Sequence, residues 1–404
     1  MKYFWIYGIL LFLELGINAC SKSSGDGDAK PADPEENPEI VEAVPISINF
    51  PEANFTNPDS IYNKSKASYA ILNRFVQLLN ATPKGDSVFI SIYLLNHDRV
   101  IKALQNAGNR GVLLHLLVDS SRSESVADNI AAYSTLAKLK NTDYSVVRSS
   151  LMVSADEHAI DHNKFAVFSS VLTPVGKKNY VVFQTSNNMT EIQCTYFQDN
   201  VIVQNEGLYD AFRLLWHDIR KYAKANMDKY TYREFDDPTA GLHGYYFPKI
   251  KNGTYFDPDP VVDLLNQITD PSKTAVRIMM FNWSAARVTI VNKLASLLDQ
   301  GAIVQVMVNA DNPETILGPI RDLANKGAFI RIFPIKSGSI VKNIHSKHML
   351  IDGVMNGKSA SVIATGSENY TIGALKQNNE TLLTVWNSPL FTPYVNNYNA
   401  IKNL

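Results

Sequence analysis

Two segments of the chain contain histidine, lysine, serine and asparagine in the same order. The first segment has His162 and Lys164, followed by Ser186 and Asn188. An imidazole can act as a nucleophile, an acid or a base near neutral pH. Ammonium and amide groups donate to the oxygens of an anionic transition state. The second segment repeats the four residue types, as His345, Lys347, Ser367 and Asn369. The duplicated set predicts chemistry at an oxygen-rich anion.

Each segment also has an acidic residue after its asparagine. Asp199 lies eleven residues after Asn188, and Glu380 lies eleven residues after Asn369. A carboxylate that accepts a hydrogen bond from one imidazole nitrogen fixes the tautomer and the orientation of the ring. We therefore predict that Asp199 and Glu380 are the carboxylate partners of the two histidines.

Both histidine–lysine pairs occur in apolar runs typical of β-strands. Successive side chains of a strand point to opposite faces, so residues two positions apart share a face. His162 and Lys164 are thus expected to project together, as are His345 and Lys347. The same spacing aligns each serine with its asparagine. Each segment is predicted to bring four polar side chains to one spot.

The elements that must position these residues are also duplicated. Short β-branched runs alternate with amphipathic helical stretches, a pattern typical of an α/β layered fold. Tyr93 and Arg99 match Phe281 and Arg287 at a constant offset of 188 residues. A period this long indicates duplication of a half-domain rather than a solenoid repeat. We expect the two arginines to lie on solvated helix faces. The predicted boundaries are 46–220 for the first half, 221–242 for the linker and 243–404 for the second half.

The repeated pattern H-x-K-x4-D followed by G-S-x-N resembles the phospholipase D superfamily. The second copy is complete, with Asp352 and Gly366, whereas the first has Ser169 and Thr185 at those positions. The resemblance implies two pseudo-symmetric α-β-α layered halves that share one interfacial active site. The motif Asp of this superfamily supports its strand away from the phosphate, so Ser169 need not abolish catalysis.

The resemblance also implies a reaction that requires no cofactor and no metal. One histidine attacks phosphorus and becomes a phosphohistidine, while the other protonates the leaving oxygen and then activates water. By analogy His162 is the nucleophile and His345 the acid, although pseudo-symmetry leaves the reverse assignment open. The lysines and asparagines would hold phosphoryl oxygens. The supporting residues expected are Ser186, Asp199, Asp352, Ser367 and Glu380. The sequence has no H-E-x-x-H, C-x-x-C or Walker motif.

The amino terminus has the pattern of a targeting segment. Lys2 precedes an apolar run over 4–13, and the stretch ends in Ala19-Cys20. It resembles a bacterial lipoprotein signal over 1–20, in which Cys20 becomes lipidated. Residues 21–45 are rich in Ser, Pro and acidic residues, which predicts a flexible acidic tether. The expected location is the cell envelope, lipid-anchored to a membrane on its periplasmic face or at the cell surface.

Three functions agree with these features. The first is a phosphoric diester hydrolase that cleaves a phospholipid head-group phosphodiester, and the second is a nuclease. The third is a catalytically weakened phosphate- or partner-binding lipoprotein, for which Ser169 is the only direct support. The 404 residues carry a net charge of −1. Because the tether carries −5, residues 46–404 carry +4, which suits an anionic substrate but is no dense basic stripe.

Overall fold

The computed structural model describes residues 42–119, 126–147, 160–222, 231–251, 254–334, 336–337, 340–341 and 343–404. The predicted signal segment, Cys20 and most of the predicted tether lie outside these residues, as does part of the predicted linker. Val44 N donates to Asn80 O at 2.9 Å, so contact with the first half begins within the last residues assigned to the tether. Within the described part of the chain, no helix has both the length and the apolar composition needed to cross a bilayer.

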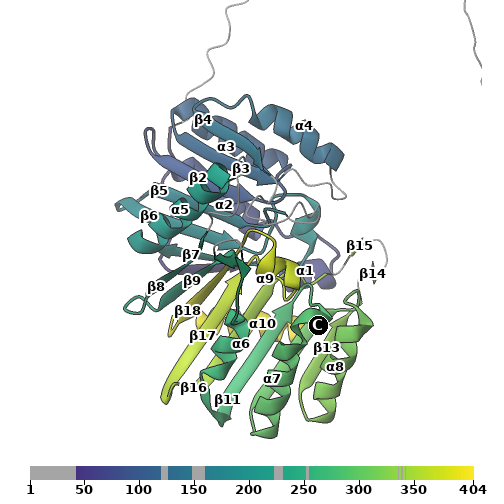
Figure 1. The fold of residues 1–404 in the computed structure, drawn as a ribbon. Coiled ribbons are helices and arrows are strands. Elements are labelled where there is room, and N and C mark those ends of the chain that lie inside the picture. Colours follow the sequence, from purple (N-terminus) through teal and green to yellow (C-terminus); the bar gives the residue numbers. More distant parts are fainter. Residues whose placement is uncertain are drawn as a thin grey trace, which may run out of the picture. The chain divides into compact units, whose positions relative to one another are not determined.

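The first half is built around a seven-stranded sheet in the order β1-β7-β6-β5-β2-β3-β4 (Figure 1). Strands β2, β3 and β4 are parallel neighbours, whereas β2 pairs antiparallel with β5, and β5, β6 and β7 are antiparallel. The strands are β1 (Glu52–Phe55), β2 (Ser87–Ile92), β3 (Leu113–Asp119), β4 (Thr142–Val147), β5 (Lys164–Thr173), β6 (Gly176–Thr185) and β7 (Asp199–Gln204).

The second half contains a sheet in the order β10-β9-β18-β17-β16-β11-β12-β13, with β8 paired to β9. The run β18-β17-β16-β11-β12-β13 repeats the run β7-β6-β5-β2-β3-β4 of the first half, which confirms the predicted duplication. The strands are β8 (Thr231–Asp237), β9 (Leu242–Lys251), β10 (Thr254–Tyr255), β11 (Ile268–Met280), β12 (Ile303–Asn309), β13 (Phe329–Phe333), β16 (Lys347–Met355), β17 (Lys358–Gly366) and β18 (Glu380–Trp386), with β14 (Lys336–Ser337) and β15 (Ile340–Val341) forming a separate pair. The predicted linker 221–242 thus contains β8, which belongs to the second sheet.

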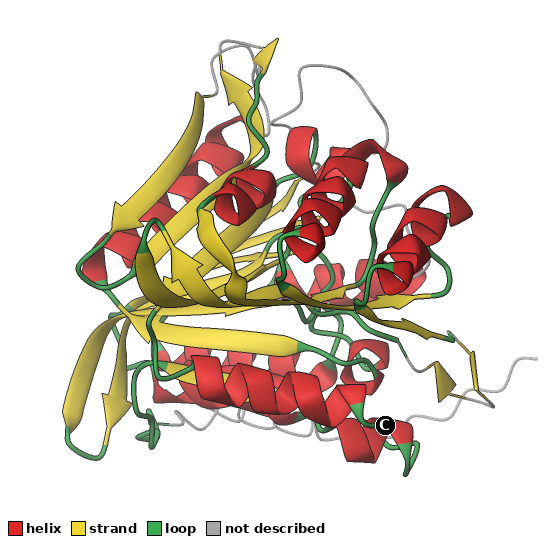
Figure 2. Cartoon of the chain, turned by 90° about the horizontal axis from the view of Figure 1, so that it is seen from below, coloured by secondary structure: helices red, strands yellow, loops and turns green. Residues whose placement is uncertain are grey.

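Helices cover both faces of each sheet (Figure 2). Helices α2 (Ala70–Ala81) and α3 (Asp98–Arg110) pack on one face of the first sheet. Helices α6 (Pro260–Asn266), α7 (Val288–Asp299) and α8 (Glu314–Asn325) pack on one face of the second. The opposite faces of both sheets share a core with α5 (Glu206–Tyr222) and α10 (Phe391–Lys402). The remaining α-helices of the described residues are α1 (Pro58–Tyr62), α4 (Val126–Leu136) and α9 (Ile372–Lys376). The two α-β-α layered halves are therefore as predicted.

The two-residue period of the strands creates these separate cores. In β2, Val88 and Ile90 join the outer core of the first half, whereas Phe89 between them joins the shared core. In β11, Ile278 faces the outer core of the second half and Met279 the shared core. Strands buried on both faces have little alternation in polarity, which explains the nearly continuous apolar runs. Each large apolar side chain buried in this way stabilises the fold by roughly 1.5–3 kcal/mol.

The strand pairing brings the repeated motifs to equivalent positions. Lys164, the first residue of β5, pairs with Ile92, the last residue of β2. Lys347, the first residue of β16, pairs in the same way with Met280 at the end of β11. Both histidine–lysine motifs therefore lie where a strand of the parallel group ends and its antiparallel neighbour begins.

Candidate active site

Each histidine is held by the backbone of the opposite half. His162 N donates to Asn379 O at 2.9 Å, and His345 N donates to Phe197 O at 2.9 Å. Asn379 lies immediately before β18, and Phe197 lies just before β7. Each histidine therefore lies against the entry to the last sheet strand of the other half, which places the site between the two halves.

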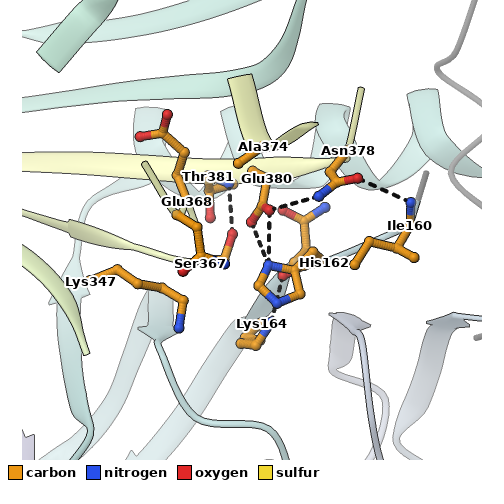
Figure 3. A network of polar contacts seen from close by, with 12 residues as sticks. Ile160, His162, Lys164, Lys347, Ser367, Glu368, Ala374, Asn378, Glu380 and Thr381 are labelled. Atoms are coloured by element: carbon orange, nitrogen blue, oxygen red, sulfur yellow. Dashed lines mark hydrogen bonds and ion pairs between the residues drawn. The ribbon is translucent and has the colours of Figure 1, made fainter. Parts of the chain in front are cut away.

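The Glu380 carboxylate contacts the His162 ring across this interface (Figure 3). Both carboxylate oxygens of Glu380 lie 2.9 Å from Nδ1 of His162. Glu380 is fully buried, and Asn378 Nδ2 donates to its Oε1 at 3.3 Å. Because Nδ1 is occupied by the carboxylate, Nε2 is the ring nitrogen left for chemistry. The geometry agrees with the predicted pairing of Glu380 with a histidine and adds that the histidine belongs to the other half.

The equivalent partner of His345 is Gln198, which the sequence did not indicate. Gln198 Oε1 lies 3.0 Å from Nδ1 of His345, and Ser186 O lies 3.1 Å from the same nitrogen. Asp199 does not contact either ring of the two motifs in the part of the chain that the structure describes. The prediction that Asp199 is the carboxylate partner of a motif histidine is therefore wrong.

A difference of one residue in the connecting segment explains this error. Ser186 N donates to Asp199 O and Ser367 N donates to Thr381 O, both at 3.0 Å. The hydroxyls of these serines accept in return from Asp199 N and Thr381 N, again at 3.0 Å. Asp199 is therefore the structural counterpart of Thr381. A shift of one residue along a strand moves a side chain to the opposite face, so Gln198 takes the place that Glu380 has in the second half.

Asp199 instead belongs to a separate buried cluster between the halves. Its carboxylate accepts from Thr365 Oγ1, accepts from the Tyr394 hydroxyl at 3.0 Å, and lies 3.6 Å from Nδ1 of His348. Burial alone would raise the pKa of Asp199, but His348 and Thr365 lower it to about 2. His348 follows Lys347 and faces the other side of β16, as the strand period predicts for a packing residue.

Both motif lysines are buried beside the histidines. Lys164 Nζ donates to His162 O at 2.7 Å, and Lys347 Nζ donates to His345 O at 2.5 Å. Burial lowers the pKa of Lys164 to about 7, although Glu380 and Asp161 act in the opposite direction. Burial and the charge of Lys164 lower the pKa of Lys347 well below its usual range. The two buried ammonium groups therefore have too little negative charge around them, and a bound anion would supply it.

The histidines and Glu380 are shifted by the same surroundings. Burial, Lys164 and Lys347 together lower the pKa of His162 well below 6.5. Burial, Lys347 and Lys164 act on His345 in the same direction. Burial raises the pKa of Glu380, whereas Lys164 and the hydrogen bonds from Ser367 and Asn378 lower it. In the free site both rings therefore favour the neutral form that an attacking imidazole needs, whereas a bound phosphodiester anion would favour the protonated form that the acid needs.

The serines and the asparagines of the two motifs have different contacts. Ser186 Oγ donates to Gln198 Oε1 at 2.9 Å, and Ser367 bonds the carboxylate of Glu380 and lowers its pKa in part. The serines therefore hold the partners of the histidines, as expected for supporting residues. Among the described residues, Oδ1 of Asn188 and Oδ1 of Asn369 have no hydrogen-bond partner although both are buried. Oδ1 is an acceptor, so a phosphoryl oxygen would have to be bound through Nδ2 of these amides.

The positions where the first copy departs from the family pattern lie away from the histidines. Ser169 Oγ donates to Asp86 Oδ1 at 3.0 Å and accepts from Ser87 N at 2.8 Å. Its counterpart Asp352 is exposed on β16 and pairs with Ala275 of β11. The expectation that the motif Asp lies away from the phosphate agrees with these positions. Asp86 supplies a carboxylate where Ser169 lacks one.

The glycine of the G-S-x-N motif has a steric role in only one half. A Cβ atom on Gly366 would lie 2.1 Å from Thr381 O, so that position requires glycine. In the first half, Thr185 Oγ1 donates to Asp199 O, the equivalent carbonyl, at 2.7 Å. Thr185 is thus accommodated by a hydrogen bond rather than by close backbone approach.

Aromatic rings that follow equivalent strands cover the two histidines. The ring centroids of Tyr93 and His162 are 5.1 Å apart, and those of Phe281 and His345 are 4.4 Å apart. Lys164 Nζ lies 5.3 Å from the Tyr93 ring centre, and Lys347 Nζ lies 4.8 Å from that of Phe281. The offset of 188 residues in the sequence therefore marks true structural counterparts, and these rings form part of each half-site.

Arg287 differs from the expectation of a solvated helix face. It is only 1% exposed, and its guanidinium bonds Asp259 at 2.7 and 2.8 Å and also contacts Glu368. Nη1 donates to Asn369 O at 3.1 Å, so Arg287 holds the loop that carries the motif asparagine. The prediction was wrong because Asp259 and Glu368 approach from segments distant in the sequence. Arg99 lies nearer the surface, 4.5 Å from the ring centre of Tyr69.

The part of the chain that the structure describes has no group of three or more His, Cys, Asp or Glu residues arranged to hold a metal ion. Cys194 is a buried free cysteine, and burial raises the pKa of its thiol to about 12.

Comparison with known proteins agrees with this duplicated architecture. A family model described as "Cardiolipin synthase, PLD-like domain" matches residues 75–214 and 264–402, one match in each half. None of the curated proteins matches the chain significantly. Polyphosphate kinase from Porphyromonas gingivalis has a similar fold, with a TM-score of 0.50 and 15% identity over 85% of this chain. The chain covers 49% of that kinase, about half its length.

Two smaller structures match single parts of the chain. Nuc from Salmonella typhimurium, described as a phospholipase D family member, is 22% identical, covers 40% of this chain and 93% of its own, and has a TM-score of 0.31. NucT from Helicobacter pylori is 15% identical, covers 43% of this chain and 97% of its own, and has a TM-score of 0.32.

The fold and the paired histidine–lysine motifs define a protein of the phospholipase D superfamily. Because the family model covers more than half of the chain, the chain belongs to the phospholipase D-like family described under cardiolipin synthase. Membership confirms the resemblance found in the sequence and places the chain in a superfamily of phosphodiesterase-type proteins.

Proposed function

We propose that the chain is a metal-independent phosphodiesterase that acts through a phosphohistidine intermediate. The observation that carries the proposal is the arrangement of two buried histidines. Each is bonded at Nδ1 by a polar side chain of the opposite half, and each lies next to a buried lysine. Fixing Nδ1 directs Nε2 of both rings to the reacting group, and the lysines supply cationic donors for a phosphoryl group.

The reaction proceeds in two displacements. In the first, Nε2 of one histidine attacks phosphorus, the bond from phosphorus to the leaving oxygen breaks, and the second histidine gives its proton to that oxygen. In the second, the latter histidine takes a proton from water, whose oxygen attacks phosphorus as the P–N bond breaks. Lys164, Lys347, Asn188 and Asn369 would bind the phosphoryl oxygens throughout. A covalent intermediate divides one difficult step into two easier ones.

The substrate we propose is the head-group phosphodiester of a phospholipid. Two observations support this choice over a nucleic acid. The family model that matches both halves is named for a synthase of the phospholipid cardiolipin. The sequence before residue 46 resembles a lipoprotein signal with an acidic tether, which would hold the site near a membrane. We accordingly propose that lipidation of Cys20 anchors the protein in the cell envelope.

The test compares wild type with His162→Ala and His345→Ala in the full chain, with chelator present. His217→Ala, which removes an exposed histidine of α5, is the matched control. The substrates are bis(4-nitrophenyl) phosphate, phosphatidylcholine vesicles and a single-stranded oligonucleotide. We expect wild type and the control to cleave the diester and the lipid, and both motif variants to lose at least about 100-fold. Preference for the oligonucleotide would replace lipid by nucleic acid as the substrate. Inactivity of wild type on all three would favour the binding protein.

A further inference from the structure

The two half-sites differ in the side chain that is bonded to Nδ1 of the histidine. Nδ1 of His345 donates to Ser186 O and Gln198 Oε1, and the Ser367 backbone and Glu380 take the equivalent places at Nδ1 of His162. The neutral amide of Gln198 thus takes the place of the Glu380 carboxylate. Gln198 is 1% exposed, so solvent does not compensate for the difference.

The hydrogen-bond network fixes which end of the Gln198 amide faces His345. Asp199 N donates to Ser186 Oγ, so the hydroxyl proton of Ser186 is free to point to Gln198. Gln198 Oε1, at 2.9 Å, lies closer to Ser186 Oγ than the other acceptor, Asp199 O at 3.3 Å, which places the amide oxygen on the side of Ser186 and His345. Nε2 of Gln198 donates to Gln193 Oε1 at 2.7 Å on the other side. Oε1 of Gln198 therefore accepts a hydrogen bond from Nδ1–H of His345, and the neutral amide does not take up the proton itself.

The charged groups around the two rings are otherwise shared. His345 faces Lys347, Lys164 and His162, and His162 faces Glu380, Lys164 and Lys347. Lys347 Nζ also lies 3.2 Å from Nδ1 of His345. The lysines destabilise a positively charged imidazolium in both half-sites. Of the groups named here, the carboxylate of Glu380 stabilises that charge, and it lies at His162.

We infer that Gln198 is a positioning residue that makes His345 the acid–base histidine and leaves His162, paired with Glu380, as the nucleophile. The inference rests on the proposed phosphodiesterase function. A phosphohistidine with a proton on Nδ1 is cationic for its whole lifetime, and a carboxylate at Nδ1 neutralises it. A residue that must give and then regain a proton near neutral pH is better served by a neutral acceptor, because a carboxylate would raise its pKa.

The first arm of the test locates the phosphoryl group. His345→Ala and His162→Ala are mixed with phosphorus-labelled bis(4-nitrophenyl) phosphate in single turnover, quenched, and digested for peptide mapping. Nitrophenolate leaves without a proton, so we expect His345→Ala to accumulate an acid-labile adduct on His162. We expect His162→Ala to form none. An adduct on His345 would overturn the assignment.

The second arm tests Gln198 itself through the pH dependence of kcat/KM for a diester with an alkyl leaving group. The alkaline limb reports loss of the proton from the acid, and the acid limb reports protonation of the nucleophile. We expect Gln198→Glu to move the alkaline limb upward by about one pH unit or more and to leave the acid limb in place. Movement of the acid limb instead would assign His345 as the nucleophile.

Two further measurements keep both arms decisive. Glu380→Gln is expected to move the acid limb of kcat/KM to lower pH. It therefore tests the same assignment of nucleophile and acid if Gln198→Glu fails to fold. NMR titration of the His345 ring in wild type and Gln198→Glu requires no turnover. A wild type without activity on any diester would reject the proposed function, whereas an unchanged His345 titration in Gln198→Glu would reject the role of Gln198 alone.

Discussion

Glu380 bonds Nδ1 of His162 with both carboxylate oxygens at 2.9 Å, although the two residues belong to different halves of the chain. Among the described residues, the carboxylate that pairs with His162 comes from the other half of the chain. The site therefore forms only when the halves pack together, and its geometry depends on the packing of the shared core. The histidine motif of one copy and the strand entry of the other form a functional unit.

Glu380 and Asp199 have the same spacing in the sequence, but we predict that their replacement by the corresponding amide has different effects. Glu380→Gln should lower kcat/KM on the order of 10²- to 10⁴-fold, because the carboxylate that orients and neutralises His162 is lost. Steady-state kinetics with bis(4-nitrophenyl) phosphate measure this loss. Asp199→Asn is the matched control and should change kcat/KM by less than about threefold, since Asp199 faces away from both motif histidines.

The same pair of variants separates activity from stability. Asp199→Asn should lower the free energy of unfolding by about 2 kcal/mol, because an ionised acceptor for Thr365, Tyr394 and His348 is removed from a buried cluster. The pKa of Asp199 is about 2, below its unfolded value, so its contribution is present above pH ~4 and disappears as pH falls toward 2. Denaturant unfolding at pH 7 and pH 3 measures both. Equal loss of activity in the two acid variants would contradict the separation.

The sequence was sufficient to predict the histidine–lysine motifs, the duplication and the α/β layers. These features depend on local rules. Residues two positions apart share a face of an extended segment, as predicted for His162 and Lys164, although β5 itself begins only at Lys164. The offset between Tyr93 and Phe281 is kept because both follow equivalent strands. Burial of the motifs at the interface of two repeats also followed from the resemblance to the superfamily.

The sequence could not predict the partners that depend on register between distant segments. Asp199 and Glu380 have equal spacing from their asparagines, but the connection in the first half is one residue shorter before the equivalent backbone bond. The spacing therefore matched by coincidence and concealed Gln198. Arg287 was misjudged for a similar reason, since its partners Asp259 and Glu368 are contributed by other elements. A comparison of loop lengths between the two copies could have raised Gln198 as a candidate.

Restoring the family residue at position 169 should destabilise the protein without changing its activity. Ser169→Asp places a second carboxylate beside Asp86, which Ser169 Oγ now contacts at 3.0 Å. We expect the free energy of unfolding at pH 7 to fall by about 1 kcal/mol and kcat/KM to remain within about twofold. Denaturant titration gives the first and steady-state kinetics the second. In the Asp86→Asn background, Ser169→Asp should lower the free energy of unfolding by less. An equal decrease in both backgrounds would rule out repulsion between the two carboxylates as the cause.

Removal of a buried lysine should stabilise the protein while abolishing its activity. The pKa of Lys164 is lowered to about 7 in the folded protein, whereas an unfolded lysine titrates near ~10.4. Burial of the charged ammonium therefore lowers the free energy of unfolding by its full amount below pH 7, and this effect disappears above pH ~10. We expect Lys164→Met to raise the free energy of unfolding at pH 7 on the order of 2–4 kcal/mol, with the gain shrinking as pH approaches 10. Denaturant unfolding across this pH range is the measurement, with the exposed Lys66→Met as control. A gain that is constant with pH would show that packing, not charge, is responsible.

Binding of an oxyanion should draw protons into the site. Lys164, with a pKa of about 7, is mostly neutral at pH 8 in the free protein, and burial and Lys164 lower the pKa of Lys347 in the same direction. A bound tetrahedral anion favours the charged form of both, so their pKa values rise and protons are taken up. We expect tungstate binding at pH 8 to take up between about half a proton and two protons. Calorimetry in two buffers of different ionisation enthalpy gives this number, since the buffer supplies the protons. Lys164→Met should reduce the uptake, whereas identical binding heats in both buffers would mean that the lysines are already charged before the anion arrives.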